Sequence, residues 1–441
     1  MDAARKPPPS ARWASFEGWD YNGMKQRLEL FMDTIHKPAL LDHVERISGK
    51  KANMSEPFSA GQYWCCFEFI LDDQNLIIAR VRLPRHPDSN ENMTEEAELY
   101  AIQCEVETME FLQHNSTTVP APKLYAYEPP GSQQAVAVGA GYMLIEGFYG
   151  NTLEDVKFDV CDLPINTQEH IIAQWTSIQA ELATFSFDRI GSISHYSQEE
   201  KGVVTVGHLA SAVAERFPSG GPFTTSQQYF EAVGEARYRS ALKDASESDE
   251  GDASDRFCVL GAFIFCDIVA RTTLFNDETK SFHLNHMDMG TQNILVDDDF
   301  KFLAIIDWEL AQTAPVQVNH FPMPFPLISS DTSIQERLQD PEHVAYRNVA
   351  RQTAAQKLYQ QKFRDAERSL AEKGRKVLPS IAEGLQGHAS RIYAILEKLG
   401  GGWGRSEEFT YEMVRLAFGI EGDEAKRYIE RMEAKINEQK G

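Results

Sequence analysis

One stretch, residues 283–309, constrains the fold of this 441-residue chain more than any other part. It reads HLNHMDMGTQNILVDDDFKFLAIIDWE and places His286, Asp288 and Asn293 in the spacing H-x-D-x-x-x-x-N. Two β-prone runs follow, ILV and FLAII, and the three aspartates between them favour a tight turn. The second run leads directly to Asp307. The stretch therefore predicts a β-hairpin that holds three polar side chains, those of Asp288, Asn293 and Asp307, at its base.

Such a set of side chains suits the transfer of a phosphoryl group. In kinases one aspartate accepts the proton of the attacking hydroxyl, and an asparagine and a second aspartate bind Mg²⁺. Mg²⁺ prefers oxygen ligands in octahedral geometry, which an amide and a carboxylate on adjacent strands can supply. Asp307 follows four apolar residues, and a carboxylate there is costly to bury without a cation. We therefore predict that Asp288 is the base, that Asn293 and Asp307 bind metal, and that His286 holds the loop in shape.

The string HMDMGTQNILVDDDFKFLAIIDWE resembles the catalytic block of the aminoglycoside phosphotransferase and choline kinase-like superfamily, in particular its fungal phosphotransferase branch. The resemblance extends from about residue 59 to about residue 326. It implies an α+β, two-lobed protein kinase-like fold, with a small antiparallel-sheet N-lobe and a large, mainly helical C-lobe. It also implies an enzyme that uses ATP and Mg²⁺ to phosphorylate a hydroxyl group of a small molecule.

The apolar patterning suggests how the chain divides. Residues 1–56 are expected to be an extension that is partly disordered and then helical. Residues 57–146 change to strand periodicity and would form the N-lobe. Residues 147–441 would form the helical C-lobe, with the catalytic loop at 283–309 and C-terminal helices over 332–440.

The predicted N-lobe offers a set of nucleotide-binding residues. Ser59 and Gly61 precede an alternating strand, which resembles the turn that lies over ATP phosphates. The next strand, LIIARVRLP, lacks the usual lysine of kinases but carries Arg80 and Arg82 on one face. Arginine can grip phosphate with two donors, so we assign this role to Arg80 and keep Arg82 as its rival. By resemblance, Glu105 on the following helix pairs with the phosphate-binding cation.

A further apolar strand, YMLIEG, ends at Glu146 and Gly147. It resembles the hinge whose backbone groups bind adenine, and glycine allows the bend. On the helix that carries Glu105, the pattern leaves open whether Glu98, Glu107 and Glu105 itself are ordinary surface charges.

The composition narrows the possible partners. With 66 acidic and 43 basic residues the net charge is −23, which argues against nucleic acid and anionic membranes. The acidic surface serves solubility, and it is also compatible with a substrate that carries a positive charge. Six cysteines without a C-x-x-C pair suggest reduced thiols in a cytoplasmic protein. The longest apolar run, about 13 residues, is too short for a membrane span of about 20, and no secretory signal is visible.

Two other classes of protein compete with a small-molecule kinase. A protein Ser/Thr kinase is disfavoured because only a few residues separate Asp307 from residues 314–315, which leaves no room for an activation loop. A pseudokinase that binds nucleotide or a partner without turnover is supported by the missing lysine and the sparse glycines. Against it, all three polar residues of the catalytic block are present.

An aminoglycoside, choline or another amino alcohol, a sugar and a fungal secondary metabolite all fit as the acceptor. In the superfamily that the chain resembles, late helices build the acceptor pocket, which makes Asp331, Glu336, Glu342 and Arg347 candidates. The acidic tract at residues 245–255 is expected to be a surface loop.

Overall fold

The computed structural model describes residues 7–11, 24–60, 63–84, 93–200, 202–247, 253–276, 281–323, 325, 329–400 and 404–440. The chain separates into two compact units. The first, called the sheet unit, comprises Met1–Phe158, Tyr196–Val203 and Thr291–Glu309. The second, called the helical unit, comprises Asp159–His195, Val204–Gly290 and Leu310–Gly441.

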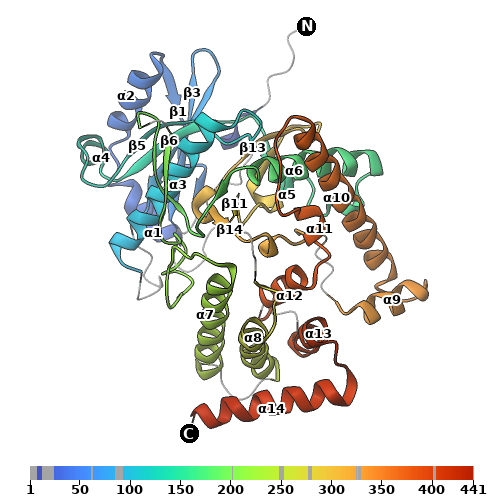
Figure 1. The fold of residues 1–441 in the computed structure, drawn as a ribbon. Helices are drawn as coiled ribbons and strands as arrows, with labels where there is room; N and C mark the ends of the chain where they lie inside the picture. Colours follow the sequence, from blue (N-terminus) through green and yellow to red (C-terminus); the bar gives the residue numbers. More distant parts are fainter. Residues whose placement is uncertain are drawn as a thin grey trace. The chain divides into compact units, whose positions relative to one another are not determined.

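The sheet unit is built on a six-stranded antiparallel sheet (Figure 1). The strand order is β1-β3-β4-β6-β5, and β2 also pairs with β3. The strands are β1 (Ala52–Met54), β2 (Ser59–Ala60), β3 (Trp64–Leu71), β4 (Leu76–Arg82), β5 (Leu124–Glu128) and β6 (Tyr142–Gly147). The helices of this unit are α1 (Met24–Met32), α2 (Lys37–Ser48), α3 (Glu95–Asn115), α4 (Gln133–Val138) and α5 (Leu153–Val156), with a short 3-10 turn η1 (Pro9–Ala11).

Alternation along β3 and β4 decides which side chains form the core of the sheet unit. Phe67 and Phe69 of β3 and Ala79 and Val81 of β4 are fully buried in one apolar cluster. Successive side chains of a strand point to opposite faces of the sheet. Arg80, between Ala79 and Val81, therefore projects from the other face.

The predicted extension, residues 1–56, forms helices α1 and α2, but it also joins the sheet. β1 pairs with β3, with Ala52 opposite Leu71. A strand of three residues is too short to give an alternating pattern, so the sequence did not indicate it.

The division of the chain differs from the expected one because strands from distant segments pair. β7 (Asn151–Thr152) pairs with β12 (Ile294–Val296), which in turn pairs with β13 (Phe302–Ile305). The sheet unit therefore continues beyond residue 146, and the predicted catalytic loop is shared: Thr291–Glu309 belongs to the sheet unit and the residues before it to the helical unit.

The helical unit packs its long helices around an aromatic core. Phe230 is fully buried, with its ring centroid 4.5 Å from that of Phe275 and 5.6 Å from that of Tyr393. α14 lies across α8 and α13 (Figure 1). The long helices are α6 (Ile165–Leu182), α7 (Ser226–Glu247), α8 (Ala253–Arg271), α9 (Asp331–Gln339), α10 (Tyr346–Glu372), α12 (His388–Leu396), α13 (Ser406–Phe418) and α14 (Gly422–Lys440). Shorter elements are η3 (Val160–Asp162), η6 (Val316–Val318), α11 (Ile381–Gly384) and the strands β8 (Ser186–Phe187), β11 (Phe282–Asn285) and β14 (Gln312–Ala314).

The predicted α+β class is confirmed, with a small antiparallel sheet and a large helical region. The acidic tract at 245–255 was expected to be a loop, but α7 runs into it as far as Glu247 and α8 begins within it at Ala253. The Ala, Ser and Glu residues of the tract are compatible with a helix. The six cysteines are free thiols. In the part of the chain that the structure describes, no helix is long and apolar enough to cross a membrane.

Candidate active site

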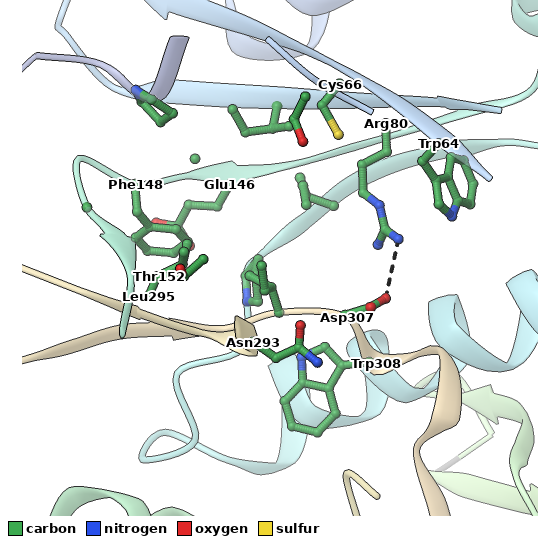
Figure 2. A pocket seen from close by; sticks show the side chains of 18 of the residues that line it. Trp64, Cys66, Arg80, Glu146, Phe148, Thr152, Asn293, Leu295, Asp307 and Trp308 are labelled. Atoms are coloured by element: carbon green, nitrogen blue, oxygen red, sulfur yellow. Dashed lines mark ion pairs between the residues drawn. The ribbon is translucent and has the colours of Figure 1, made fainter. Parts of the chain in front are cut away.

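A cavity of about 420 Å³ lies in the sheet unit between the sheet and the β12–β13 hairpin. Figure 2 shows Arg80 and Asp307 facing each other at one end, and Phe148, Thr152 and Leu295 at the other. Most residues predicted for the site from the sequence line this cavity: Ser59, Arg80, Glu105, Glu146, Gly147, Asn293 and Asp307. Gly61 lies outside the described residues.

Arg80 and Glu105 form a buried ion pair in this cavity. The distance between Arg80 Nη1 and Glu105 Oε1 is 2.5 Å, and the Glu105 side chain is only 1% exposed. Burial raises the pKa of Glu105, and the positive charge of Arg80 and a hydrogen bond from the backbone N–H of Trp308 partly offset that rise. The Arg80 guanidinium also lies 4.9 Å from the centre of the Trp64 ring. These contacts hold the guanidinium in one orientation toward the cavity.

Arg82 has different partners and does not line this cavity. Its Nη2 is 2.8 Å from Oε2 of Glu98, and its guanidinium stacks 4.7 Å from the centre of the Tyr63 ring. Glu98 is thus the partner of a half-buried arginine and not an ordinary surface charge. Glu107 is not a surface charge either: it is 7% exposed and accepts a hydrogen bond of 2.6 Å from the backbone N–H of Tyr196.

The β12–β13 hairpin brings Asn293 and Asp307 to the same wall of the cavity. The backbone N–H of Ile306 donates to the carbonyl oxygen of Asn293 at 2.9 Å, which fixes the two chain ends side by side. Trp308 is buried, and its indole N–H donates to the carbonyl oxygen of Ile305 at 2.8 Å. Asp307 has a left-handed backbone (φ +67°), and its Oδ1 lies 3.6 Å from Nη2 of Arg80 (Figure 2).

Glu309 is a fourth carboxylate of the cavity, besides those of Glu105, Glu146 and Asp307. Its burial, together with the charges of Asp307 and Glu105, raises its pKa to about 7. The charges of Arg80 and Arg82 offset only part of this rise, and such a concentration of carboxylates favours the binding of a cation.

The other end of the cavity is formed where β6 ends. Glu146 and Gly147 line it, and the backbone N–H of Glu146 donates to the carbonyl oxygen of Lys123 at 2.8 Å. A Cβ on Gly150 would come within 2.6 Å of the carbonyl oxygen of Val296, so only glycine lets this segment approach β12 so closely. Phe148 and Leu295 make this end apolar (Figure 2).

His286 and Asp288 lie in the helical unit, at the end of β11. His286 is only 1% exposed. The side-chain oxygen of Asn285 accepts the backbone N–H of Met287 at 2.8 Å, and its amide donates to Asn319 at 2.9 Å. Met287 adopts a left-handed backbone (φ +65°). This turn presents Asp288 to a second cavity, of about 220 Å³, within the helical unit.

The second cavity combines carboxylates with aromatic rings. Besides Asp288, its walls include Glu215, Glu397, Tyr229 and Tyr393. Glu397 pairs with Arg237 at 2.8 Å, and Arg237 does not line the cavity. Desolvation raises the pKa of Glu215, and the charge of Arg237 offsets part of that rise. Three carboxylates, those of Asp288, Glu215 and Glu397, line the cavity, and one arginine of the described residues, Arg237, lies beside them. The cavity therefore favours a positively charged group.

The late-helix residues predicted for the acceptor pocket are not brought to this cavity. Asp331 is bound to Arg391 and Arg415, with O–N distances of 3.0 and 2.8 Å. Glu336 and Glu342 are exposed. α9 has no buried residue, so the periodic charges of this region belong to a solvated helix.

Sequence reasoning missed several residues of the two cavities. Trp64 was overlooked because an aromatic residue in a strand is typical of a core, and Phe148, which follows the end of β6, carries no local motif. Cys66 stands opposite Arg80 in the β3–β4 register, so strand alternation could have found it. Glu215 and Glu397 carry no local motif.

No protein-family model and no curated protein matches this chain. Similar solved structures include a protein assigned as a fructosamine-3-kinase from Thermobifida fusca, with 12% identity, 86% of this chain and 98% of that chain covered, and a TM-score of 0.43. A macrolide 2'-phosphotransferase from Brachybacterium faecium has 15% identity, coverage of 87% and 99%, and a TM-score of 0.39. A glucosamine kinase in complex with glucosamine, ADP and inorganic phosphate has 12% identity, coverage of 88% and 93%, and a TM-score of 0.37.

Proposed function

We propose that this protein is an ATP- and Mg²⁺-dependent kinase that transfers the γ-phosphoryl group of ATP to a hydroxyl group of a small molecule. The observation that carries the proposal is the cavity of the sheet unit, where the buried Arg80–Glu105 pair faces Asn293 and Asp307. A phosphate-binding cation opposite an amide and a carboxylate is the set of groups that phosphoryl transfer needs.

The cavity suits a nucleotide because its two ends differ. Ile78, Ile145 and Leu295 offer apolar surface for a base near Glu146 and Gly147. Arg80, at the opposite end, has a guanidinium that can donate two hydrogen bonds to phosphate oxygens.

The residues present also fit a magnesium ion. The amide oxygen of Asn293 and the carboxylate of Asp307 are hard oxygen ligands, and Mg²⁺ is commonly held by one or two side chains with phosphates and water. When bound, the ion would neutralise charge on the phosphates. Asn293 and Asp307 would hold it, and Arg80 would bind phosphate beside them.

Asp288 is assigned the proton transfer. Its carboxylate would accept the proton of the acceptor hydroxyl, while the buried His286 would keep the loop in shape. The cavity that Asp288 lines would hold the acceptor, and its carboxylates and tyrosines favour a compact hydroxyl compound that carries an amine.

A screen of ATP consumption against hydroxyl compounds tests the function. Neutral sugars and alcohols would be compared with amino sugars and amino alcohols of matched size, and the Asp288→Asn protein would serve as the blank. We expect turnover with at least one amine-bearing compound. If the protein binds Mg·ATP but turns over none of them, the pseudokinase alternative becomes the better one.

Replacing Arg80 tests the phosphate contact. Arg80→Lys should weaken nucleotide binding by about tenfold, because lysine keeps the charge but loses the two-donor fork. We choose Arg80→Lys over Arg80→Ala, because removing the cation beside the buried Glu105 would cost about 3–5 kcal/mol of folding stability. Arg82→Lys is the matched control and should bind nucleotide as the wild type does. Calorimetry measures the affinity of both variants for ADP. A larger loss of affinity in Arg82→Lys than in Arg80→Lys would assign the phosphate contact to Arg82.

A further inference from the structure

A short segment near the start of the chain forms part of the wall of the nucleotide cavity. Residues 7–11, called the N-terminal strap, contain the 3-10 turn η1, closed by a hydrogen bond of 3.0 Å from the N–H of Ala11 to the carbonyl oxygen of Pro8. Pro9 is buried and lines the cavity together with Phe58 and Phe148. The strap thus meets the apolar end of the cavity, where we place the base.

Ser10 anchors the strap to the sheet. Its backbone N–H donates to Oε2 of Glu68 at 3.0 Å, and its hydroxyl donates to Oε1 at 2.8 Å. Both oxygens of one carboxylate are therefore held by one residue of the strap. Glu68 lies in the middle of β3 and is only 1% exposed.

The register of β3 places this anchor on the cavity side of the sheet. Glu68 stands opposite Ile78, and Cys66 stands opposite Arg80. Cys66, Ile78 and Arg80 all line the cavity, and residues two apart on a strand share a face. Glu68 therefore faces the same side as the phosphate-binding arginine.

A carboxylate in that position needs hydrogen-bond donors. Among the described residues no lysine or arginine forms an ion pair with Glu68, and the two hydrogen bonds to its carboxylate both come from Ser10. A buried carboxylate without donors is costly, so the seated strap is favoured.

We propose that the N-terminal strap is a positioning element of the nucleotide site: Pro9 covers the bound base, and the Ser10–Glu68 contact holds it there. This inference rests on the proposed function. The cavity keeps about 420 Å³ with the strap seated, so the strap is a wall of the site and does not fill it. Breaking the Ser10–Glu68 contact should let bound nucleotide leave faster.

Dissociation of a fluorescent ADP analogue, measured by stopped flow, tests the proposal. Ser10→Ala removes the hydroxyl donor to a carboxylate, a bond worth about tenfold in an equilibrium, so the dissociation rate should rise about fivefold to tenfold. Ser10→Thr keeps the hydroxyl and should restore the wild-type rate. Deleting residues 2–11 should raise the rate at least as much, and adding Glu68→Gln to that deletion should change it little further.

The matched control is Glu56→Gln. Glu56 is an exposed carboxylate of the same unit that pairs with Lys37 and makes no described contact with the strap. The Glu56→Gln protein should therefore release the ADP analogue at the wild-type rate. Equal thermal unfolding of Ser10→Ala and Ser10→Thr would separate a local effect from general loosening. If the wild type binds the analogue but Ser10→Ala and the deletion release it at the wild-type rate, the strap proposal is overturned. If the wild type binds no nucleotide, the proposed kinase function fails first.

Discussion

Asp288→Asn is expected to lower turnover by roughly 10²–10⁴-fold, the usual cost of removing a general base. Asparagine has nearly the same shape as aspartate but cannot accept the hydroxyl proton. Because Asp288 lines the cavity of the helical unit and not the nucleotide cavity, affinity for Mg·ATP should stay close to that of the wild type. Steady-state kinetics with the acceptor found by the screen, together with calorimetry, measures the two quantities separately.

Asp299→Asn provides an isosteric control for this experiment. Asp299 is an exposed residue in the turn between β12 and β13, where it donates its backbone N–H to Asp297. The same chemical change there should leave turnover unchanged. Turnover of Asp288→Asn at the wild-type level would show that another group accepts the proton.

Asp307→Asn should weaken the binding of Mg·ATP by at least about tenfold, since even outer-shell partners of a metal ligand are worth about 10–100-fold in metal affinity. Asparagine is chosen over alanine because residue 307 has a left-handed backbone, which asparagine tolerates better. Binding of ATP in the presence of a chelator should not weaken, because the substitution removes a negative charge beside Arg80 and no metal is bound.

Calorimetric titrations with and without Mg²⁺ distinguish these outcomes. The Asp299→Asn protein again serves as the control, because it removes one carboxylate from the same hairpin. Equal affinity of Asp307→Asn and the wild type for Mg·ATP would contradict the metal role of Asp307. A loss of affinity with chelator as well would indicate damage to the cavity and not loss of a metal ligand.

Much of the nucleotide cavity could be predicted because its parts are local in sequence. The β12–β13 hairpin has β-prone runs on both sides of an acidic turn, and Asn293 and Asp307 flank it. Local geometry alone brings such residues together. The proton-accepting and metal-binding roles of Asp288, Asn293 and Asp307 remain predictions that the variants above test.

The choice between Arg80 and Arg82 could not be made from local pattern. Both arginines lie on one face of β4, and either could have entered the cavity. Their partners on α3 decide which arginine lines the cavity: Arg80 contacts the buried Glu105, whereas Arg82 contacts Glu98 about two helical turns earlier. The position of a helix against a strand depends on packing over the whole unit, which no short motif encodes.

By itself, the sequence predicted the β-hairpin with its polar residues and the strand that carries Arg80 and Arg82. These follow from periodicity and spacing, which act over a few residues, whereas the α+β class and the role of Glu105 were implied by the resemblance to a kinase-like superfamily. Only the tertiary structure decided that the N-terminal strap reaches the nucleotide cavity, since Ser10 and Glu68 are 58 residues apart. It also decided that Glu215 and Glu397 gather around the cavity of Asp288. Contacts between distant segments form when apolar surfaces pack, and the polar groups that this packing brings together share no pattern along the chain.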